Sequence, residues 1–204
     1  MGEHWGDGLI ETVGTLDPVE LREITGTSLV EQVYTLRVSA WRRFIHIPDS
    51  VRRWEDQEDA EARHWAFLAG DRPVAAARLS IHLHIDRVPD AEVYRNVVSE
   101  LPAPIGSLNR CVVQSDFRGR ELAPALDRVR ISAARKSGCR SLIVAIDQPR
   151  RATTLESHGF RLAGTGEPYT VGVLKGVPNI VYVMHFDHPR NANFDRGRSA
   201  KIVP

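Results

Sequence analysis

Residues 111–126 read CVVQSDFRGRELAPAL, and this stretch decides how the rest of the chain is interpreted. An apolar run ends at Val113, a polar turn follows, and a helical pattern then begins. A helix N-terminus exposes about four unsatisfied N–H groups and about half a positive charge, so it can hold a phosphate. Gly119 lets the backbone approach a ligand closely, and Arg118 and Arg120 add positive charge. The stretch predicts a pyrophosphate site, although an ordinary turn with exposed arginines would show the same residues.

The helix after this turn is the clearest element of the chain. Apolar residues recur there at i, i+4, i+7 and i+11, from Leu122 to Ala133, and Gly138 stands at the C-cap position. The apolar run that follows is of the kind buried on both faces of a sheet. The expected order is βα(α)ββ(α)βαβαββ. Strands are predicted at 19–24, 64–69, 74–82, 107–114, 141–146, 160–173 and 179–186, and helices near 28–44, 90–100, 122–137 and 148–158.

Length and charge narrow the class of protein. The 204 residues correspond to one domain with extra segments, because a typical domain has roughly 150 residues. The 27 Lys and Arg residues nearly balance the 26 Asp and Glu residues, which leaves a net charge of +1. Such a chain has no global field for a nucleic acid or an anionic membrane, so any phosphate affinity must be local.

The cysteines and the apolar runs argue against several other classes. Cys111 and Cys139 lack the spacing of a metal site or a disulfide framework. No apolar run reaches the roughly 18 residues of a membrane span, and the N-terminus is acidic, unlike a signal peptide. We therefore expect a cytoplasmic protein with no metal, no membrane segment and no nucleic-acid partner.

The turn and the segments after it resemble a known family. VVQSDFRGRELAPAL (112–126) is similar to the acyl-CoA-binding motif of the GNAT N-acetyltransferases, a strand followed by [QR]-x-x-G-x-[GA] opening a helix. LIVAIDQPRRATTLESHGF (142–160) is similar to that family's next strand and its short helix ending in G-F. The resemblance implies one α/β domain over 19–188, with a lead-in of 1–18 and a polar tail of 189–204. Its sheet would be mixed, mostly antiparallel, flanked by helices, and splayed between the fourth and fifth strands to admit CoA.

The resemblance also implies acetyl-CoA, or another acyl-CoA, as co-substrate. The residues it places in the pyrophosphate turn are Arg118, Gly119, Arg120, Leu122 and Ala123, and those on the strand beside the pantetheine arm are Cys111, Val112 and Val113. Glu121 departs from the motif, because a carboxylate replaces the family's central glycine near two phosphates. We expect Glu121→Gly to tighten CoA binding and to cost the helix roughly 0.5 to 1 kcal/mol.

Neither usual catalytic residue of the family is present. Many members carry a strand glutamate as base where Ser107 stands, and a tyrosine that protonates the thiolate where Leu155 stands. Proton transfer would then need a water chain, a substrate group or a side chain from another wall. The candidates are Asn109, which strand alternation places on the face of Ser107 and Cys111, then His82 and His84, then Tyr169. Each is more often a packed or merely polar residue than a base, and nothing in sequence pairs Cys111 with a histidine to make it a nucleophile.

Other segments resemble different branches of the same fold. LRVSAW (36–41), DQED (56–59) and AARL (76–79) resemble acyl-homoserine-lactone synthases and N-acyl amino acid synthases. GVPNIVYVM (176–184) instead resembles small bacterial acetyltransferases of the ElaA type. A structural ion network tying the first helix to the sheet would also explain a set of charged residues, which are Arg37, Asp56, Asp59, Arg78 and Arg110.

The sequence thus predicts transfer of an acetyl or other acyl group from CoA to a primary amine of a small molecule. The amine would attack directly, assisted by backbone N–H groups near Val112 and Val113, without a covalent enzyme intermediate. Two alternatives stay open. One is an acyl-homoserine-lactone-synthase-like or N-acyl amino acid synthase-like enzyme that uses acyl-carrier protein, and the other is a non-catalytic CoA-binding regulatory protein. The identity of the amine and the oligomeric state, a homodimer included, are also open.

Overall fold

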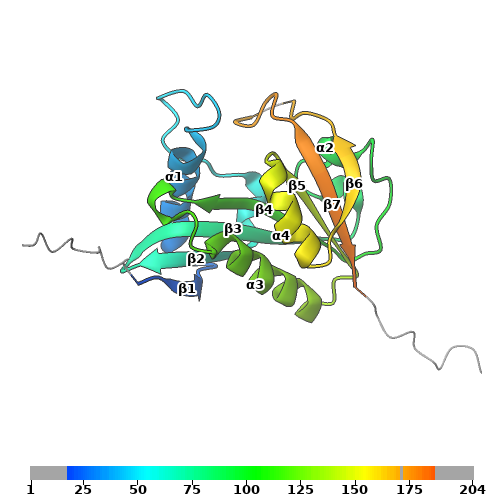
Figure 1. The fold of residues 1–204 in the computed structure, drawn as a ribbon, viewed down its shortest axis with the longest axis horizontal. Coiled ribbons are helices and arrows are strands. Elements are labelled where there is room, and N and C mark those ends of the chain that lie inside the picture. The colour runs from blue at the N-terminus through cyan, green and yellow to red at the C-terminus, as the bar shows by residue number, and fades with distance from the viewer. Residues whose placement is uncertain (1–17, 171, 187–204) are drawn as a thin grey trace, which may run out of the picture.

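A computed structural model gives the fold, and it describes residues 18–170 and 172–186 (Figure 1). One seven-stranded sheet runs through the molecule in the order β1-β2-β3-β4-β5-β7-β6. Its strands are β1 (Glu20–Glu23), β2 (Arg63–Ala69), β3 (Arg72–His82), β4 (Ile105–Val113), β5 (Ser141–Ile146), β6 (Arg161–Gly166) and β7 (Asn179–His185). The α-helices are α1 (Leu29–Trp41), α2 (Ala91–Tyr94), α3 (Leu122–Lys136) and α4 (Ala152–Ser157), with short 3₁₀ turns between them.

β4 and β5 form a parallel pair, whereas the other neighbouring strands pair antiparallel. The parallel pairing joins residues 105–107 of β4 to residues 141–143 of β5 and stops there. β4 then continues to Val113 alongside β3, while β5 continues to Ile146 alongside β7. The two strands therefore diverge toward their carboxyl ends. The predicted mixed, mostly antiparallel sheet, split between its fourth and fifth strands, is confirmed.

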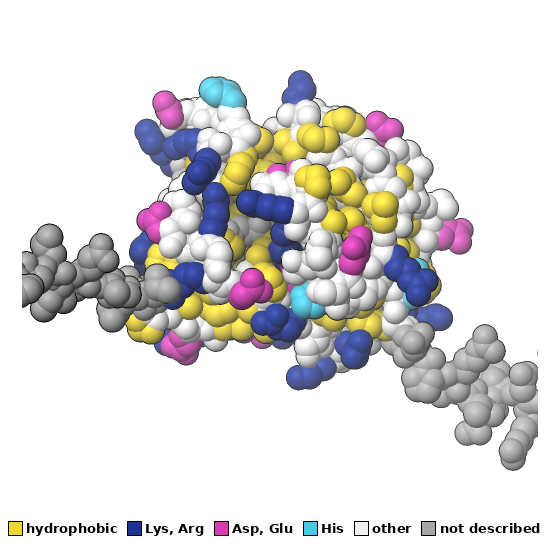
Figure 2. Space-filling model, in the orientation of Figure 1, with side chains coloured by type: hydrophobic (Ala, Val, Ile, Leu, Met, Phe, Trp, Pro, Cys, Tyr) yellow, Lys and Arg dark blue, Asp and Glu magenta, His cyan; other side chains and the backbone are white. Residues whose placement is uncertain are grey.

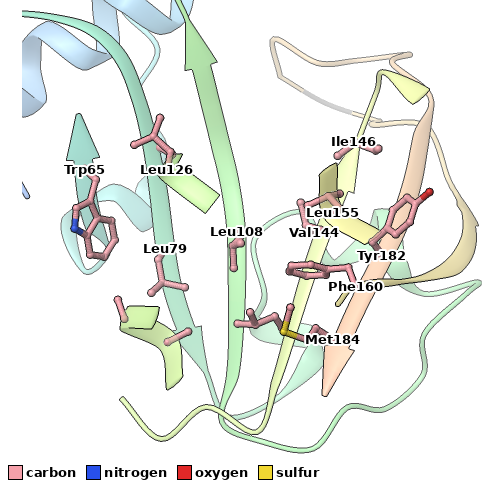
Figure 3. Close-up of a cluster of buried hydrophobic side chains, with 14 of the residues drawn as sticks. Trp65, Leu79, Leu108, Leu126, Val144, Ile146, Leu155, Phe160, Tyr182 and Met184 are labelled. Atoms are coloured by element: carbon pink, nitrogen blue, oxygen red, sulfur yellow. The ribbon is translucent and has the colours of Figure 1, made fainter. Parts of the chain in front are cut away.

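Helices cover both faces of the sheet. On one face, Leu79 of β3 joins the core under α3 and α4, where it shares a cluster with Leu126 and Leu155 (Figure 3). On the other face, Ala76 of β3 packs in a cluster with residues of α1. A third cluster joins α2 to β5 and β7. Each fully buried leucine-sized side chain contributes about 1.5–3 kcal/mol, so these clusters fix the helices on the sheet.

A buried ion network ties α1 to the sheet, as one interpretation of the charged residues predicted. The Asp59 carboxylate accepts two hydrogen bonds from Arg37 of α1, at 2.6 and 2.8 Å, and one from Arg78 of β3 at 2.9 Å. Asp56 accepts hydrogen bonds from Arg78 and Arg110. Burial acts to raise the pKa of Asp59, but the guanidinium groups of Arg37 and Arg78 hold it well below its usual range.

Two predicted helices are shorter in the structure. The helix expected over 90–100 is confined to α2, because Asp90 takes a left-handed conformation with φ 61° immediately before it and the chain turns again after Tyr94. The first helix ends at Trp41 rather than near 44, and a turn follows in which the Phe44 N–H donates to the Trp41 carbonyl at 2.8 Å.

The strand expected over 160–173 is also shorter, because β6 stops at Gly166. Pro168 lacks the N–H that continued pairing would require. The chain instead forms a loop, in which the Gly176 N–H donates to the Tyr169 carbonyl at 2.8 Å. This loop places the Tyr169 side chain beside the divergence of β4 and β5, with consequences for the site described below.

Parts of the sequence prediction fall outside the described residues, namely 1–17 of the lead-in and the whole tail of 189–204. Within the described part of the chain, no helix combines the length and apolar character that crossing a membrane requires.

Candidate active site

A cavity of about 410 Å³ opens where β4 and β5 diverge. It is lined by the end of α1, the outer half of β4 with the turn into α3, the end of β5, and the loop between β6 and β7. Figure 2 shows Lys and Arg side chains gathered next to apolar side chains on this face of the molecule. The predicted site residues in the lining are Asn109, Cys111, Val112, Val113, Arg118, Gly119, Glu121, Leu122, Ala123 and Tyr169. Arg120 and His82 lie outside it, and the Arg120 guanidinium rests over the Phe117 ring at 5.0 Å.

The turn from β4 into α3 has the geometry of an anion site. Gly119 takes φ +77° and Glu121 takes φ +58°, so the chain reverses sharply before α3 begins. The first helical hydrogen bond runs from the Ala125 N–H to the Glu121 carbonyl at 3.1 Å, and Glu121 provides no side-chain cap. The N–H groups of Leu122 and Ala123 therefore project from the helix end without a helical acceptor, at the edge of the cavity.

Arginine side chains concentrate positive charge at this end of the cavity. Arg118 donates to two backbone carbonyls, at 3.3 and 3.4 Å, and its guanidinium lies over the Phe44 ring at 4.8 Å. Burial, together with the nearby charges of Arg43 and Arg150, lowers the pKa of Arg118. An anion bound between these groups would relieve their mutual repulsion. The near-neutral net charge of the chain means that a phosphate site needs local positive charge, and these arginines supply it.

The outer half of β4 carries a bulge. Its register against β3 shifts by one residue there, and Arg110 takes φ +52°. The extra residue reverses the alternation of side chains, so Cys111 packs with the α3-side core, whereas Asn109 stays with Ser107 on the other face. The prediction that Asn109 and Cys111 share a face is wrong, because it assumed unbroken alternation along the strand.

Cys111 lies near a second buried ion network on the α3 side of β4. The Asp127 carboxylate accepts hydrogen bonds from Arg130 and from Arg151, the latter at 2.9 Å. Burial raises the pKa of the Cys111 thiol, although the charges of Arg151 and Arg130 oppose this effect. Since the thiolate is the nucleophilic form, this environment suits a residue that lines the cavity and not one that forms a covalent intermediate.

The proton-transfer candidates occupy different places. The Asn109 amide accepts a hydrogen bond from Arg78 at 2.6 Å and donates to Ser107 at 3.1 Å, so its polar atoms are engaged in positioning. His82 ends β3 outside the cavity lining, and burial lowers its pKa. His84 is exposed. Leu155, where many family members have a tyrosine, is fully buried beside Val144 in the core (Figure 3).

Two polar residues of the cavity lining and one residue that binds Arg110 were not singled out in the sequence. Tyr94 and Asp147 line the cavity, and Asp90 binds the Arg110 guanidinium at 3.2 Å. Burial and the charge of Asp90 raise the pKa of Tyr169, so its hydroxyl stays protonated well above neutral pH. A signal for Asp147 existed, because it directly follows a buried strand and the carboxyl ends of neighbouring parallel strands meet at one edge.

The comparison with protein families agrees with this geometry. Residues 30–160 match the model described as the acetyltransferase (GNAT) family, a span that includes all but the first residue of α1, the diverging strands, and the turn into α3. The chain belongs to the GNAT family. The predicted resemblance is thereby confirmed, and GNAT enzymes transfer acyl groups from CoA. The protein is therefore an acetyltransferase of GNAT type.

Solved structures share this GNAT fold at low sequence identity. FeeM, an N-acyl amino acid synthase from uncultured soil microbes, is 13% identical with a TM-score of 0.61, over 82% of this chain and 92% of that one. The ribosomal-protein-S18-alanine N-acetyltransferase from Escherichia coli is 15% identical with a TM-score of 0.58, over 86% and 98%. A GNAT family acetyltransferase from Elizabethkingia anophelis, solved with acetyl-CoA bound, is 12% identical with a TM-score of 0.53, over 84% and 100%. These identities establish the fold alone, and none of the curated proteins compared with the chain matches it.

Glu121→Gly should stabilise this GNAT protein, which corrects the expectation that the change would weaken α3. Glu121 is the N-cap of α3 and has φ +58°, a conformation that glycine adopts without the cost of roughly 1–2 kcal/mol borne by other residues. The sequence expectation had treated the position as helical. Removing a carboxylate from the cavity edge should also tighten CoA binding. Thermal unfolding measures the stability, and a lower melting temperature would contradict the expected stabilisation. CoA titration measures the affinity, and weaker binding would contradict the expected gain.

Proposed function

We propose that the cavity transfers an acetyl or other acyl group from CoA to the primary amine of a small molecule. The observation that carries the proposal is the divergence of β4 from β5 directly beside the N-terminus of α3. Beyond Ser107, β4 has an edge that β5 leaves unpaired, to which an extended pantetheine arm can add. The N–H groups of Leu122 and Ala123, with Arg118, suit the pyrophosphate.

Direct transfer forms one C–N bond and breaks one C–S bond. The neutral amine attacks the thioester carbonyl, whose developing negative charge is stabilised by strand N–H groups near Val112 and Val113. The amine loses a proton, and the departing thiolate gains one. We assign the proton that the thiolate gains to the Tyr169 hydroxyl, because this protonated phenol lines the cavity.

The rate should rise with pH as the free amine deprotonates, without an acid limb from a histidine base. His82 lies outside the cavity lining, and the raised pKa of Tyr169 excludes its titration near neutrality. The measurement is kcat/KM for the amine between pH 6 and 10, compared for the wild type, His82→Ala and Tyr169→Phe. We expect Tyr169→Phe to lower kcat on the order of 100-fold and His82→Ala to leave the profile unchanged. A limb near pH 6.5 that disappears in His82→Ala would contradict this assignment.

The donor is tested by thermal shift with acetyl-CoA, a long-chain acyl-CoA, and CoA. Any ligand that binds the folded protein raises its melting temperature, and a concentration of 100 times Kd adds about 2.7 kcal/mol. A panel of primary amines with detection of released thiol then tests transfer. Stabilisation by none of the CoA compounds, with activity from acyl-carrier protein, would favour the synthase alternative. CoA binding without acylation of any amine would favour a regulatory protein, an alternative motivated by Ser107, Leu155 and Glu121.

A further inference from the structure

The structure points to an occupant for the part of the cavity that is lined by the end of β5 and the loop between β6 and β7. We propose that the Asp147 carboxylate binds the ammonium group of the acceptor, and that this amine is carried on an apolar or aromatic body without a carboxylate. This inference rests on the proposed acyl transfer and names its acceptor class.

Asp147 follows β5 directly and lines the cavity. Ile143 and Ala145 of β5 pack in the cluster that contains Tyr94 and is flanked by Tyr169. Asp147 comes immediately after the end of β5 and lines the same cavity as Tyr94 and Tyr169. Its negative charge contributes to the raised pKa of Tyr169, so the carboxylate and the phenol are electrostatic neighbours. Asp147 therefore lies on the β5 side of the cavity, close to the group proposed to protonate the thiolate.

The cations of the inner cavity already have carboxylate partners. Arg110 binds Asp56 and Asp90, while Arg151 binds Asp127 at 2.9 Å. Within residues 18–170 and 172–186, no arginine, lysine or histidine forms an ion pair with Asp147. The cavity thus offers a carboxylate that can accept hydrogen bonds from an ammonium group. A charged amine would gain charge-assisted hydrogen bonds there.

One wall of the cavity is apolar. It is formed by Trp41 at the end of α1 and by Leu174 and Val177 of the loop between β6 and β7. Trp41 also meets Trp54 edge to face, with ring centroids 6.0 Å apart. Burying an apolar body against this wall removes apolar surface from water, which favours binding. A carboxylate on the acceptor would instead lose its hydration near the negative charge of Asp147, while Arg110 and Arg151 are already paired with other carboxylates.

The acceptor therefore enters as an ammonium ion on Asp147 and reacts as the free amine. A first proton leaves its nitrogen for solvent water, and the nitrogen lone pair then attacks the thioester carbon. A second proton leaves the nitrogen for solvent water as the C–S bond breaks, so that a neutral amide forms. The thiolate takes the Tyr169 proton, which solvent restores. Asp147 is a substrate-binding residue in this scheme, and the reaction needs no other reactant than the amine and the acyl-CoA.

The test compares two amines that differ by one carboxylate, phenethylamine and phenylalanine, in wild-type protein and Asp147→Asn. The asparagine keeps the size of the side chain and removes its charge. We expect phenethylamine to bind the CoA-loaded wild type at least tenfold more tightly than phenylalanine by calorimetry. Asp147→Asn should weaken phenethylamine binding about tenfold, raise the KM for this amine, and leave the KM for acetyl-CoA unchanged. Asp71→Asn, in the exposed turn between β2 and β3, is the matched control and should change none of these values.

Calorimetry and thiol release separate this inference from the proposed function. The inference would be overturned if phenethylamine bound Asp147→Asn as well as the wild type, if it did not bind the wild type, or if phenylalanine bound more tightly. This would hold even if other amines caused the release of free CoA thiol from the acyl-CoA. Loss of phenethylamine binding in Asp147→Asn supports it, even without turnover, whereas CoA binding without acylation of any amine overturns only the proposed transfer. Equal melting temperatures for wild type and Asp147→Asn exclude unfolding as the cause of a loss.

Discussion

Asp59→Ala should lower the free energy of unfolding by about 3–5 kcal/mol, because breaking a buried ion pair leaves charged partners without compensation. The Asp59 side chain is fully buried and binds Arg37 and Arg78, which are also fully buried. Without it, Asp56 remains as their carboxylate, at 3.9 Å from Arg37 and 3.1 Å from Arg78, and it already binds Arg110. Urea denaturation at neutral pH measures the loss.

The contribution of Asp59 to stability depends on pH in a defined direction. Its pKa in the folded protein lies below the value near 4 expected for the unfolded chain. The unfolded state therefore binds the proton more readily, and the contribution is present above about pH 4 and is lost as the pH falls toward the folded-state pKa. Asp59→Ala should accordingly cost most at neutral pH and progressively less in acid.

Glu23→Ala provides the matched control for a lost carboxylate. Glu23 pairs with Arg63 at 2.8 Å between neighbouring strands, but both side chains are more than a third exposed, at 39% and 38%. Exposed pairs of this kind contribute about 0–1 kcal/mol. A cost for Asp59→Ala no larger than that for Glu23→Ala would show that the buried network is not what holds α1 on the sheet.

Much of the fold could be predicted because the patterns that specify it are local. The apolar spacing from Leu122 to Ala133 is a property of one helix, and the alternating or continuous apolar runs of the central strands are similarly self-contained. The turn at Gly119 could also be predicted, since a strand, a glycine between arginines and a helix follow each other directly. The predicted ends of the helices and strands were less accurate, because these ends depend on turn conformations such as that of Asp90.

The interior of the candidate site could not be predicted in the same way. The bulge at Arg110 reverses the faces of the residues after it, yet arginine is not a residue that signals positive φ, so alternation alone placed Cys111 on the wrong face. Asp90 is distant in sequence from β4, whose Arg110 it binds, and Asp147, although it directly follows β5, is distant in sequence from Tyr169. Their proximity to Tyr169 depends on the path of two loops, and the spacing of apolar residues in the sequence does not predict that path.

Replacing both Arg118 and Arg150 with alanine should weaken CoA binding by roughly 2–4 kcal/mol, or about 30- to 1,000-fold. The sequence had paired Arg118 with Arg120, but the structure places Arg150 in the cavity lining and Arg120 outside it. Arg118 and Arg150 line the same cavity, and the charge of Arg150 contributes to the lowered pKa of Arg118. Arg120→Ala alone should therefore have the smaller effect, and calorimetric titration with CoA measures each variant.

The double variant also removes two positive charges, and this general effect needs its own control. Arg128 and Lys136 lie on the exposed surface of α3, outside the lining of the cavity. Arg128→Ala with Lys136→Ala removes the same amount of positive charge from the surface of α3, and screening at physiological salt leaves long-range attraction weak. CoA affinity should then fall far more in the Arg118 and Arg150 variant than in this control. Equal losses of CoA affinity in the two double variants would show that the turn attracts CoA only through general positive charge. Unchanged affinity in both would place the phosphates elsewhere, because two guanidinium groups in contact with an anion cannot be removed without a loss of binding.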